Sequence, residues 1–511
     1  MITEIFTSAT YGVDAFTIRV ETHLDSAMQP SFAVVGLPDN TVKEARDRVS
    51  AAIKNSGFDF PRGKRITINL SPADVKKEGS GLDLPIAIAI LTETSQIKPD
   101  KVKRFIILGE LSLDGKIRTV AGVLPIAIET RRHDFDGLII PRDNADEGAI
   151  VGGINIYPFD NLTDVVNFLN DELEVVPHKV EEKEIFKTDR DFLLDFSDVK
   201  GQEEVKRAME IAAAGAHNII MIGLPGSGKT MLAKRLPSIL PPLTREEALE
   251  TTKIHSIAGI LPPGKSLITT RPFRSPHHTA SDVSIVGGGV NAKPGEISFA
   301  HNGVLFLDEL TEFKKNVLEV LRQPLEDKVI TVSRAKITVQ YPSNFMFVAA
   351  MNPTPAGTQK EMSMYNGYDI QRFLSKISGP ILDRIDIHIH VNPVDINDLS
   401  SKRESERSEK VRERVVRARE IQLRRFKNLK GIYSNSNIGS KELKEFCRLN
   451  RAGEEILKTA TGKFGLSARA YDKILKVART IADLSGAANI ESAHIGEAVQ
   501  YRSLDRTNWV Y

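Results

Sequence analysis

The glycine-rich stretch GLPGSGKT at residues 223–230 constrains the possible fold more strongly than any other part of the sequence. It follows the apolar run NIIMI and precedes MLAKRL, so the expected order is strand, glycine loop and helix. Glycines let backbone N–H groups surround phosphate oxygens, and the helix N-terminus adds a favourable dipole. Lys229 should reach the β- and γ-phosphates, and Thr230 should hold Mg²⁺. The pattern predicts an α/β domain with an ATP-binding loop of Gly223, Leu224, Pro225, Gly226, Ser227, Gly228, Lys229 and Thr230.

Two further apolar runs are predicted to be strands that end in polar residues. GVLFLDEL places Asp308 and Glu309 directly after a buried-type strand, and FMFVAAMNP places Asn352 after another. The carboxyl ends of parallel strands form the edge at which ligands bind. We expect Asp308 to complete the Mg²⁺ site, Glu309 to activate the attacking water, and Asn352 to orient that water or sense the γ-phosphate. For Asn352 an Asn-Pro turn is the simpler alternative.

The chain has 511 residues, which is too long for one hydrophobic core and enough for two to four domains. Residues 1–170 have mixed α/β character, and residues 171–195 form a charged linker. Residues 196–395 alternate strands and helices, which is typical of a parallel α/β core. Residues 396–511 are almost entirely helical in pattern. The fold class is therefore α/β and multidomain, with a helical C-terminal part.

Bulk composition excludes several classes of protein. The net charge of +2 is nearly balanced, so any basic surface must be local. The single cysteine, Cys447, excludes an internal disulfide framework and a cysteine-rich zinc site. Neither a secretory signal nor an uncharged membrane-length segment is present, so we expect a cytoplasmic protein with no membrane partner.

Two arginines carry no local motif that settles their role. Arg384 lies in SGPILDRIDIHI, and Arg469 lies in LSARAYDKILKVARTIADL. Phosphoryl-transfer sites often take an arginine from outside their own loops to stabilise the charge of the transition state. A surface salt bridge is the simpler interpretation of either residue alone.

Taken together, these segments resemble the ComM/YifB family of AAA+ ATPases, often described as magnesium-chelatase-like. The motifs that carry the resemblance, spread over nearly the whole chain, are GLPGSGKT, GVLFLDEL, AAMNP, SGPILDRID, LSARAYDKILKVARTIADL and HIGEAVQYRSLDR. The resemblance implies a P-loop AAA+ core, a helical lid and a homo-oligomeric ring, usually a hexamer, with ATP between subunits. It also implies that Asn352 is sensor 1, that Arg384 is an arginine finger acting on a neighbour's nucleotide, and that Arg469 is the sensor 2 arginine.

The same resemblance implies two loops whose basic residues could contact DNA. An insertion within SDVSIVGGGVNAKPGEISFAHNG contains Lys293, and a hairpin within KVITVSRAKITVQYP carries Arg334 and Lys336 near its tip. Short basic loops in a ring pore could follow the phosphate backbone of branched or single-stranded DNA. A surface hairpin with routine charges is the alternative.

One departure concerns metal. Many members of the family carry several cysteines between sensor 1 and the arginine finger, which suggests a zinc site. This chain has none in that segment, so we expect ATP and Mg²⁺ but no zinc.

The N-terminal domain resembles the Lon protease fold, a variant of the ribosomal S5 domain 2-like fold. A Lon-type peptidase needs a serine nucleophile and a lysine that takes its proton. In KEGSGLDL the nucleophile position is Gly81, with Ser80 one residue early, and the lysine position is Leu124. We therefore expect a domain that keeps the shape of a peptidase without its catalytic dyad.

Three functions remain after these observations. The resemblance favours a helicase that couples ATP hydrolysis to DNA branch migration in homologous recombination and natural transformation. A magnesium-chelatase motor subunit and a protein-remodelling ATPase are the alternatives. The glycine-rich insertion and the basic hairpin tip favour DNA, because a polypeptide-moving pore loop would carry an aromatic residue among apolar ones.

Overall fold

The computed structural model describes residues 3–26, 28–77, 79–181, 193–262, 265–289, 292–334, 337–353, 377, 379–394, 405–429 and 431–502. The chain forms two compact units, one of residues 1–189 with 245–269 and one of residues 190–244 with 270–511. The segment 245–269, which the sequence assigns to the core at 196–395, therefore packs with the first unit. The helical C-terminal part belongs to the same unit as the P-loop core.

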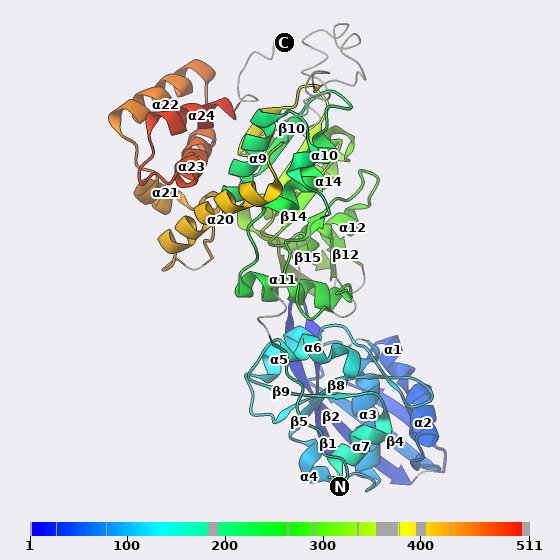
Figure 1. Cartoon of the computed structure of the whole chain (residues 1–511). Helices are drawn as coiled ribbons and strands as arrows, with labels where there is room; N and C mark the ends of the chain where they lie inside the picture. Colours follow the sequence, from blue (N-terminus) through cyan, green and yellow to red (C-terminus); the bar gives the residue numbers. More distant parts are fainter. Residues whose placement is uncertain are drawn as a thin grey trace. The chain divides into compact units, whose positions relative to one another are not determined.

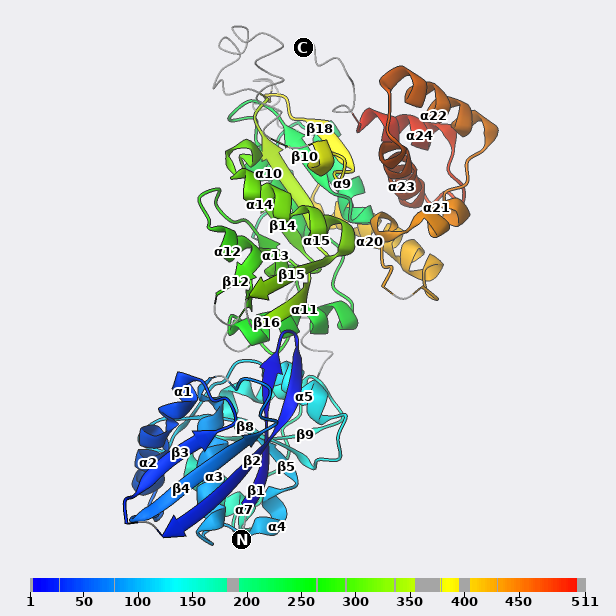
Figure 2. The ribbon, with the colours of Figure 1, turned by 180° about the vertical axis from the view of Figure 1, so that it is seen from behind.

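The first unit is built on a mixed seven-stranded sheet with the order β3-β4-β2-β1-β5-β8-β9. The long strands β1, β2 and β4 lie side by side and antiparallel, while β5, β8 and β9 are parallel (Figure 2). The strands are β1 (Thr3–Tyr11), β2 (Asp14–Ser26), β3 (Ser31–Val35), β4 (Lys64–Ser71), β5 (Phe105–Ile107), β8 (Gly137–Pro141) and β9 (Asn155–Phe159), with a small hairpin of β6 (Glu110–Leu111) and β7 (Ile117–Arg118).

Helices in the first unit complete its core. Helix α3 is buried over nearly its whole length, because PIAIAIL has no polar face to turn toward water. The helices are α1 (Asn40–Lys43), α2 (Ala45–Asn55), α3 (Asp83–Glu93), α4 (Pro99–Val102), α5 (Val123–Thr130), α6 (Ala145–Ala149), α7 (Leu162–Leu169) and α11 (Arg245–Ala258).

Helix α11 is joined to the rest of the first unit by hydrogen bonds. The Ser256 hydroxyl donates to Glu147 Oε1 at 2.5 Å, and the Ser256 carbonyl accepts from the Gly122 N–H at 3.1 Å. Burial raises the pKa of the Glu147 carboxyl. These bonds explain why a segment from within the expected core at 196–395 packs with the first unit.

The second unit contains a five-stranded sheet with the order β11-β14-β17-β10-β18, all neighbours parallel. The strands are β10 (Ile219–Ile222), β11 (Phe273–Arg274), β14 (Val304–Leu307), β17 (Met346–Met351) and β18 (Ile387–His390). All residues of β10, β14 and β17 are buried, as expected for central strands covered on both faces. The strand before the glycine loop thus lies in the sheet interior, and its carboxyl end forms the binding edge.

Helices and two small hairpins surround this sheet (Figure 1). The helices are α9 (Glu203–Gly215), α10 (Lys229–Arg235), α12 (Asp282–Val286), α13 (Glu296–Phe299), α14 (Lys315–Val320), α15 (Arg322–Asp327) and α18 (Gly379–Leu382). The hairpins pair β12 (Gly287–Gly288) with β13 (Lys293–Pro294), and β15 (Val329–Arg334) with β16 (Ile337–Pro342).

Four C-terminal helices follow α20 (Ser408–Arg425), and they share one hydrophobic core with α9 and the central strands of the sheet. They are α21 (Ser440–Phe446), α22 (Arg451–Phe464), α23 (Ala468–Leu484) and α24 (Ser492–Gln500). Side-chain caps begin two of them: Asn450 accepts from Gly453 N–H, and Ser467 accepts from Ala470 N–H. Within the described ranges, no helix is both long and apolar enough to cross a bilayer.

Candidate nucleotide-binding site

The glycine loop connects β10 to α10, which begins at Lys229. Gly226 and Gly228 have φ of 79° and 93°, and a Cβ added at either would find no other heavy atom within 4 Å. A left-handed backbone beside open space lets N–H groups face a phosphate. The loop geometry fits a nucleotide phosphate.

The loop lysine and the asparagine after β17 are in direct contact. Lys229 Nζ donates to the carbonyls of Gly223 at 2.8 Å and Leu224 at 2.9 Å, and to Asn352 Oδ1 at 3.2 Å. Burial lowers the pKa of Lys229, while the two carboxylates after β14 oppose that effect. Residues from two separate strand ends therefore form one cluster.

Thr230 and Asp308 form a second contact at the same edge. Thr230 Oγ1 donates to Asp308 Oδ2 at 2.6 Å. Hydroxyl and carboxylate oxygens suit Mg²⁺, which usually keeps water or phosphate oxygens as its other ligands. Among the described residues no cluster of three or more His, Cys, Asp or Glu side chains could hold a metal ion.

Glu309 stands at the same strand end with a more open environment. Its backbone is left-handed, with φ of 52°, and its side chain is 55% exposed. Its Oε2 lies 3.5 Å from Nδ1 of His278, a residue that follows β11 and stacks on His277. An exposed carboxylate beside the phosphate loop has room to accept a proton from water.

The two arginines do not lie at this edge. Ile387, the first residue of β18, pairs with Ile219 of β10, so Arg384 precedes the amino end of the sheet. A strand of four residues separates the two edges by about 13 Å. The Arg384 and Arg469 guanidinium groups instead meet at the carboxylate of Glu326, with Nη2–Oε1 distances of 2.5 and 3.5 Å.

The predicted DNA-contact residues lie in the two hairpins of the second unit. Lys293 is exposed in β13, opposite Gly288 of β12. A Cβ at Gly288 would lie 2.2 Å from Arg334 Nη2, so the guanidinium at the end of β15 lies directly on that glycine backbone. The structure thus brings Lys293 and Arg334 to one surface, whereas Lys336 lies outside the described residues.

In the first unit, the polar groups of the turn before α3 contact side chains of the same unit. The Ser80 hydroxyl donates to Glu110, and the buried Asp83 carboxylate pairs with Arg48 at 2.7 Å. Gly81 lies where an added Cβ would first meet Val120 Cγ1 at 3.4 Å, an ordinary contact. A Cβ would thus fit at Gly81.

The position where a Lon-type peptidase would carry its lysine is occupied by a leucine. Leu124 is fully buried in the first turn of α5, and its N–H donates to Glu147 Oε1 at 3.0 Å. A leucine has no group that can take a proton.

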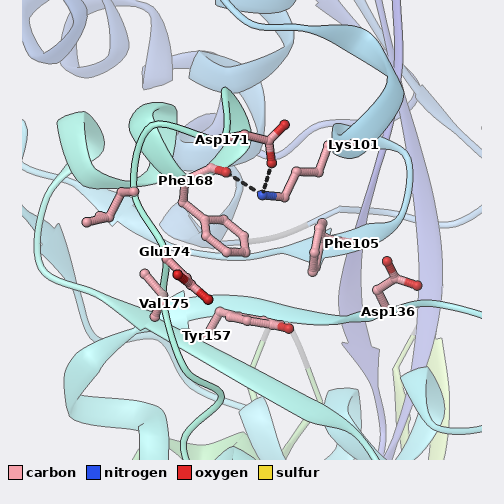
Figure 3. A pocket seen from close by; sticks show the side chains of 9 residues that line it. Lys101, Phe105, Asp136, Tyr157, Phe168, Asp171, Glu174 and Val175 are labelled. Carbon is pink, nitrogen blue, oxygen red and sulfur yellow. Dashed lines mark hydrogen bonds and ion pairs between the residues drawn. The ribbon is translucent and has the colours of Figure 1, made fainter.

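A pocket of about 400 Å³ lies elsewhere in the first unit (Figure 3). Phe105, Tyr157 and Phe168 form an aromatic wall. Lys101 Nζ lies 4.0 Å from the Phe168 ring centroid and 2.8 Å from an Asp171 oxygen, so its charge is balanced by groups within the pocket. None of the lining residues belongs to the Lys77–Leu84 turn.

Two residues of the second unit were missed by the sequence argument. Glu326 lies in a short helix, α15, and His278 lies in the loop after β11, and neither belongs to a motif with a known mechanism. Their contacts join residues far apart in the chain, so no local pattern could have identified them.

Three family models match the chain. They are described as magnesium chelatase, subunit ChlI, over residues 195–399; subunit ChlI of Mg-chelatase, over residues 20–144; and magnesium chelatase, subunit ChlI C-terminal, over residues 405–502. Together they span both units described above.

Individual relatives match over almost the full length. The competence protein ComM of Haemophilus influenzae is 44% identical, with 98% of this chain and 97% of the relative covered. The Escherichia coli protein YifB is 43% identical over the same shares. The magnesium-chelatase 38 kDa subunit of Rhodobacter capsulatus is 24% identical, with 31% of this chain and 50% of the relative covered.

Proposed function

The chain belongs to the ComM/YifB family of magnesium-chelatase-like AAA+ ATPases, and on that premise we propose that it is a hexameric DNA motor. The motor would couple ATP hydrolysis to branch migration of DNA during homologous recombination and natural transformation. The name of the Haemophilus relative, a competence protein, supports the connection with DNA uptake. We place this activity in the cytoplasm.

Hydrolysis is assigned to the groups at the carboxyl edge of the sheet. Lys229 binds the β- and γ-phosphates, and Asn352 orients the attacking water or senses the γ-phosphate. Mg²⁺ held by Thr230 and Asp308 would neutralise phosphate charge. Glu309 accepts the proton of the attacking water, since its carboxylate is the exposed one at this edge.

The position of Arg384 supports assembly into a ring. Because Arg384 precedes the amino end of β18, it lies at the edge opposite its own glycine loop and is suited to a neighbour's nucleotide. Mixing Arg384→Ala subunits with Glu309→Gln subunits should then restore part of the turnover that each lacks alone. Mixtures no more active than their components would contradict a finger acting between subunits.

The observation that carries DNA as the substrate is the surface shared by Lys293 and Arg334. Among described residues, neither side chain forms an ion pair with a carboxylate. Two unneutralised cations from separate hairpins, one lying on a glycine backbone, can approach phosphates without displacing an acid. We propose that Lys336, which lies in sequence between β15 and β16, belongs to the same surface.

The experiment is ATP-dependent migration of a mobile DNA junction. Wild type should migrate the junction, whereas Glu309→Gln should bind ATP and DNA without migration. Arg334→Ala and Lys336→Ala should weaken DNA-stimulated turnover about tenfold, because each removes a phosphate contact. Lys458→Ala, which removes an exposed charge from α22, is the matched control and should behave as wild type.

A second candidate is a motor subunit that acts on a metal-chelatase partner or on another protein. The family models and the partial match to chelatase subunits favour it. Absence of junction migration, together with no stimulation of ATPase by any DNA form, would favour this candidate over the DNA motor.

For the first unit we propose a Lon-like, ribosomal S5 domain 2-like fold that lacks the peptidase dyad. The support is the buried Leu124 at the expected lysine position and the absence of a side chain at Gly81. Its role would be a collar that stabilises the ring.

A further inference from the structure

A single carboxylate connects the two arginines that the ATPase mechanism needs. Glu326 Oε1 lies 2.5 Å from Arg384 Nη2 and 3.5 Å from Arg469 Nη2. The three residues come from α15, the turn after α18 and the first turn of α23. Glu326 therefore joins the P-loop core to the C-terminal helices at the point where both arginines lie.

The backbone of Arg384 is held in place independently of Glu326. Its carbonyl oxygen accepts from Asn218 Nδ2 at 3.0 Å and from Lys473 Nζ at 3.1 Å. The main-chain N–H of Asn218 donates to the buried Asp386 carboxylate, which also binds Lys473. The backbone of Arg384 is thus fixed beside the start of β10, the strand that leads into the glycine loop.

The guanidinium group of Arg384 has fewer partners that fix its direction than the backbone has. Its side chain is only 11% exposed, Nη1 donates to the Pro380 carbonyl at 2.5 Å, and Nε is buried without a partner. In the parts of the chain that the structure describes, Glu326 is its only acidic partner. Removal of this carboxylate would leave an enclosed charge with one carbonyl and would free its direction.

Electrostatics explains why one acid can hold both arginines. The hydrogen bond from Arg384 is the main cause that lowers the pKa of Glu326, and the charges of Arg384, Arg469 and Arg322 add to it. The carboxylate therefore stays ionised at neutral pH. Between two guanidinium groups, a fixed negative charge offsets the repulsion that would otherwise separate them.

We propose that Glu326 is a positioning residue that holds Arg384 and Arg469 together as one pair for the nucleotide of a neighbouring subunit. The inference rests on the proposed ATPase mechanism. It makes the second arginine act beside the first, on the same phosphate, instead of at the glycine loop of its own chain. Glu326 is 45% exposed and Arg469 is 59% exposed, so a phosphate from outside can reach Arg469 directly. The Arg384 side chain is 11% exposed, and its contact with the same phosphate is part of the proposal.

The test uses the full chain without DNA, so its result does not depend on the DNA-motor proposal. Glu326→Gln keeps the shape of the side chain and removes its charge. Turnover should fall about tenfold, whereas the Kd for ATP and the assembled mass should stay within about twofold. Binding of ADP with aluminium fluoride, which mimics the transferring phosphoryl group, should weaken about tenfold because the arginines contact that state.

Matched variants separate positioning from general structural loss. Glu319→Gln removes a partly exposed acid that pairs with Arg322 at 2.7 Å and should leave turnover unchanged. Glu326→Asp keeps the charge and should recover part of the activity, which also serves if Glu326→Gln folds poorly.

A double-mutant cycle gives the decisive outcome. In an Arg384→Ala background, Glu326→Gln should have a much smaller effect than in the wild type, because one of the two residues that it positions is gone. The proposal is overturned if Glu326→Gln turns over and binds aluminium fluoride as wild type, or if the two substitutions reduce turnover independently. Loss of activity in Lys229→Ala and Glu309→Gln, with Glu326→Gln normal, would keep the ATPase assignment and reject only this inference.

Discussion

Two glycine-containing turns precede helices in this chain, and they differ in what surrounds their polar groups. In the second unit, Lys229 and Thr230 contact residues from the ends of neighbouring strands, at 3.2 Å from Asn352 and 2.6 Å from Asp308. In the first unit, the turn before α3 places the Ser80 hydroxyl against Glu110.

Two other charged groups of the first turn are enclosed. Asp83 is buried against Arg48, and the fully buried Lys77 donates to the Pro72 carbonyl. By contrast, the Lys229 ammonium and the Thr230 hydroxyl of the phosphate loop contact polar groups that follow two other strands. The two turns therefore differ in their partners: the first forms buried pairs, whereas the second gathers groups from several strand ends at one edge.

The largest effect should follow from Lys229→Ala. The substitution removes the ammonium group that joins the glycine loop to Asn352, so the phosphate charge loses its main cation. We expect ATP turnover to fall by about 100-fold or more in a phosphate-release assay. Lys234→Ala, which removes an exposed charge from the same helix, is the control, and equal losses in both variants would contradict the assignment.

A stability test is provided by Arg48→Met in α2, which removes the ion-pair partner of Asp83. The change leaves Asp83 buried without its counter-ion, and burial already raises the pKa of this carboxyl. The free energy of unfolding of the first unit should fall by about 2 kcal/mol, since Arg48 is partly exposed. Hydrogen exchange of α3 measures this loss.

The surface pair Arg19–Glu4 provides the comparison for that variant. Arg19→Met should change the free energy of unfolding by less than about 0.5 kcal/mol, because exposed ion pairs contribute little. If Arg48→Met is as mild as Arg19→Met, the first turn is not held together by its buried pair.

The pH dependence of the free energy of unfolding tests a buried lysine of the second unit, Lys328. Burial lowers the pKa of Lys328 from 10.5 to about 8, so the folded chain binds fewer protons than the unfolded chain between these values. The free energy of unfolding should therefore rise with pH across that window, by up to about 1.4 kcal/mol per pH unit from this group. Urea unfolding at pH 7.5, 8.5 and 9.5 measures the slope.

Lys328→Met should remove this contribution to the slope. Lys77→Met in the first unit acts in the same direction, because burial also lowers the pKa of Lys77. A slope that is unchanged in Lys328→Met would mean that this ammonium group is well solvated.

The smallest effect should follow from Ser80→Ala. The Ser80 hydroxyl faces a carboxylate, and Leu124 occupies the position where a peptidase would need a lysine. We therefore expect no reaction with fluorophosphonate and no change in ATP turnover. Labelling of Ser80 in the wild type, lost in Ser80→Ala, would show that the first turn keeps nucleophilic chemistry.

The nucleotide site could be predicted from sequence because its parts are local. Lys229 and Thr230 follow a strand and begin a helix, so their directions depend on a few neighbouring residues. Asp308 and Asn352 follow apolar strands, and parallel strands bring their carboxyl ends to one edge. The fold class of the second unit rests on the same alternation.

The positions of Arg384 and Arg469 required the tertiary structure. Sequence similarity assigned each a role, but neither their common contact with Glu326 nor the edge at which they lie follows from a motif. A helix and two loops must first pack, since guanidinium direction is set by partners from distant segments.

What the sequence by itself determined is therefore the glycine loop of residues 223–230 and the strands around it, because backbone geometry and hydrophobic pattern act over short distances. Only the tertiary structure decided that residues 245–269 pack with the N-terminal unit and that Glu326 gathers the two arginines. Both depend on burial and charge pairing between segments far apart in the chain, which short-range patterns do not encode.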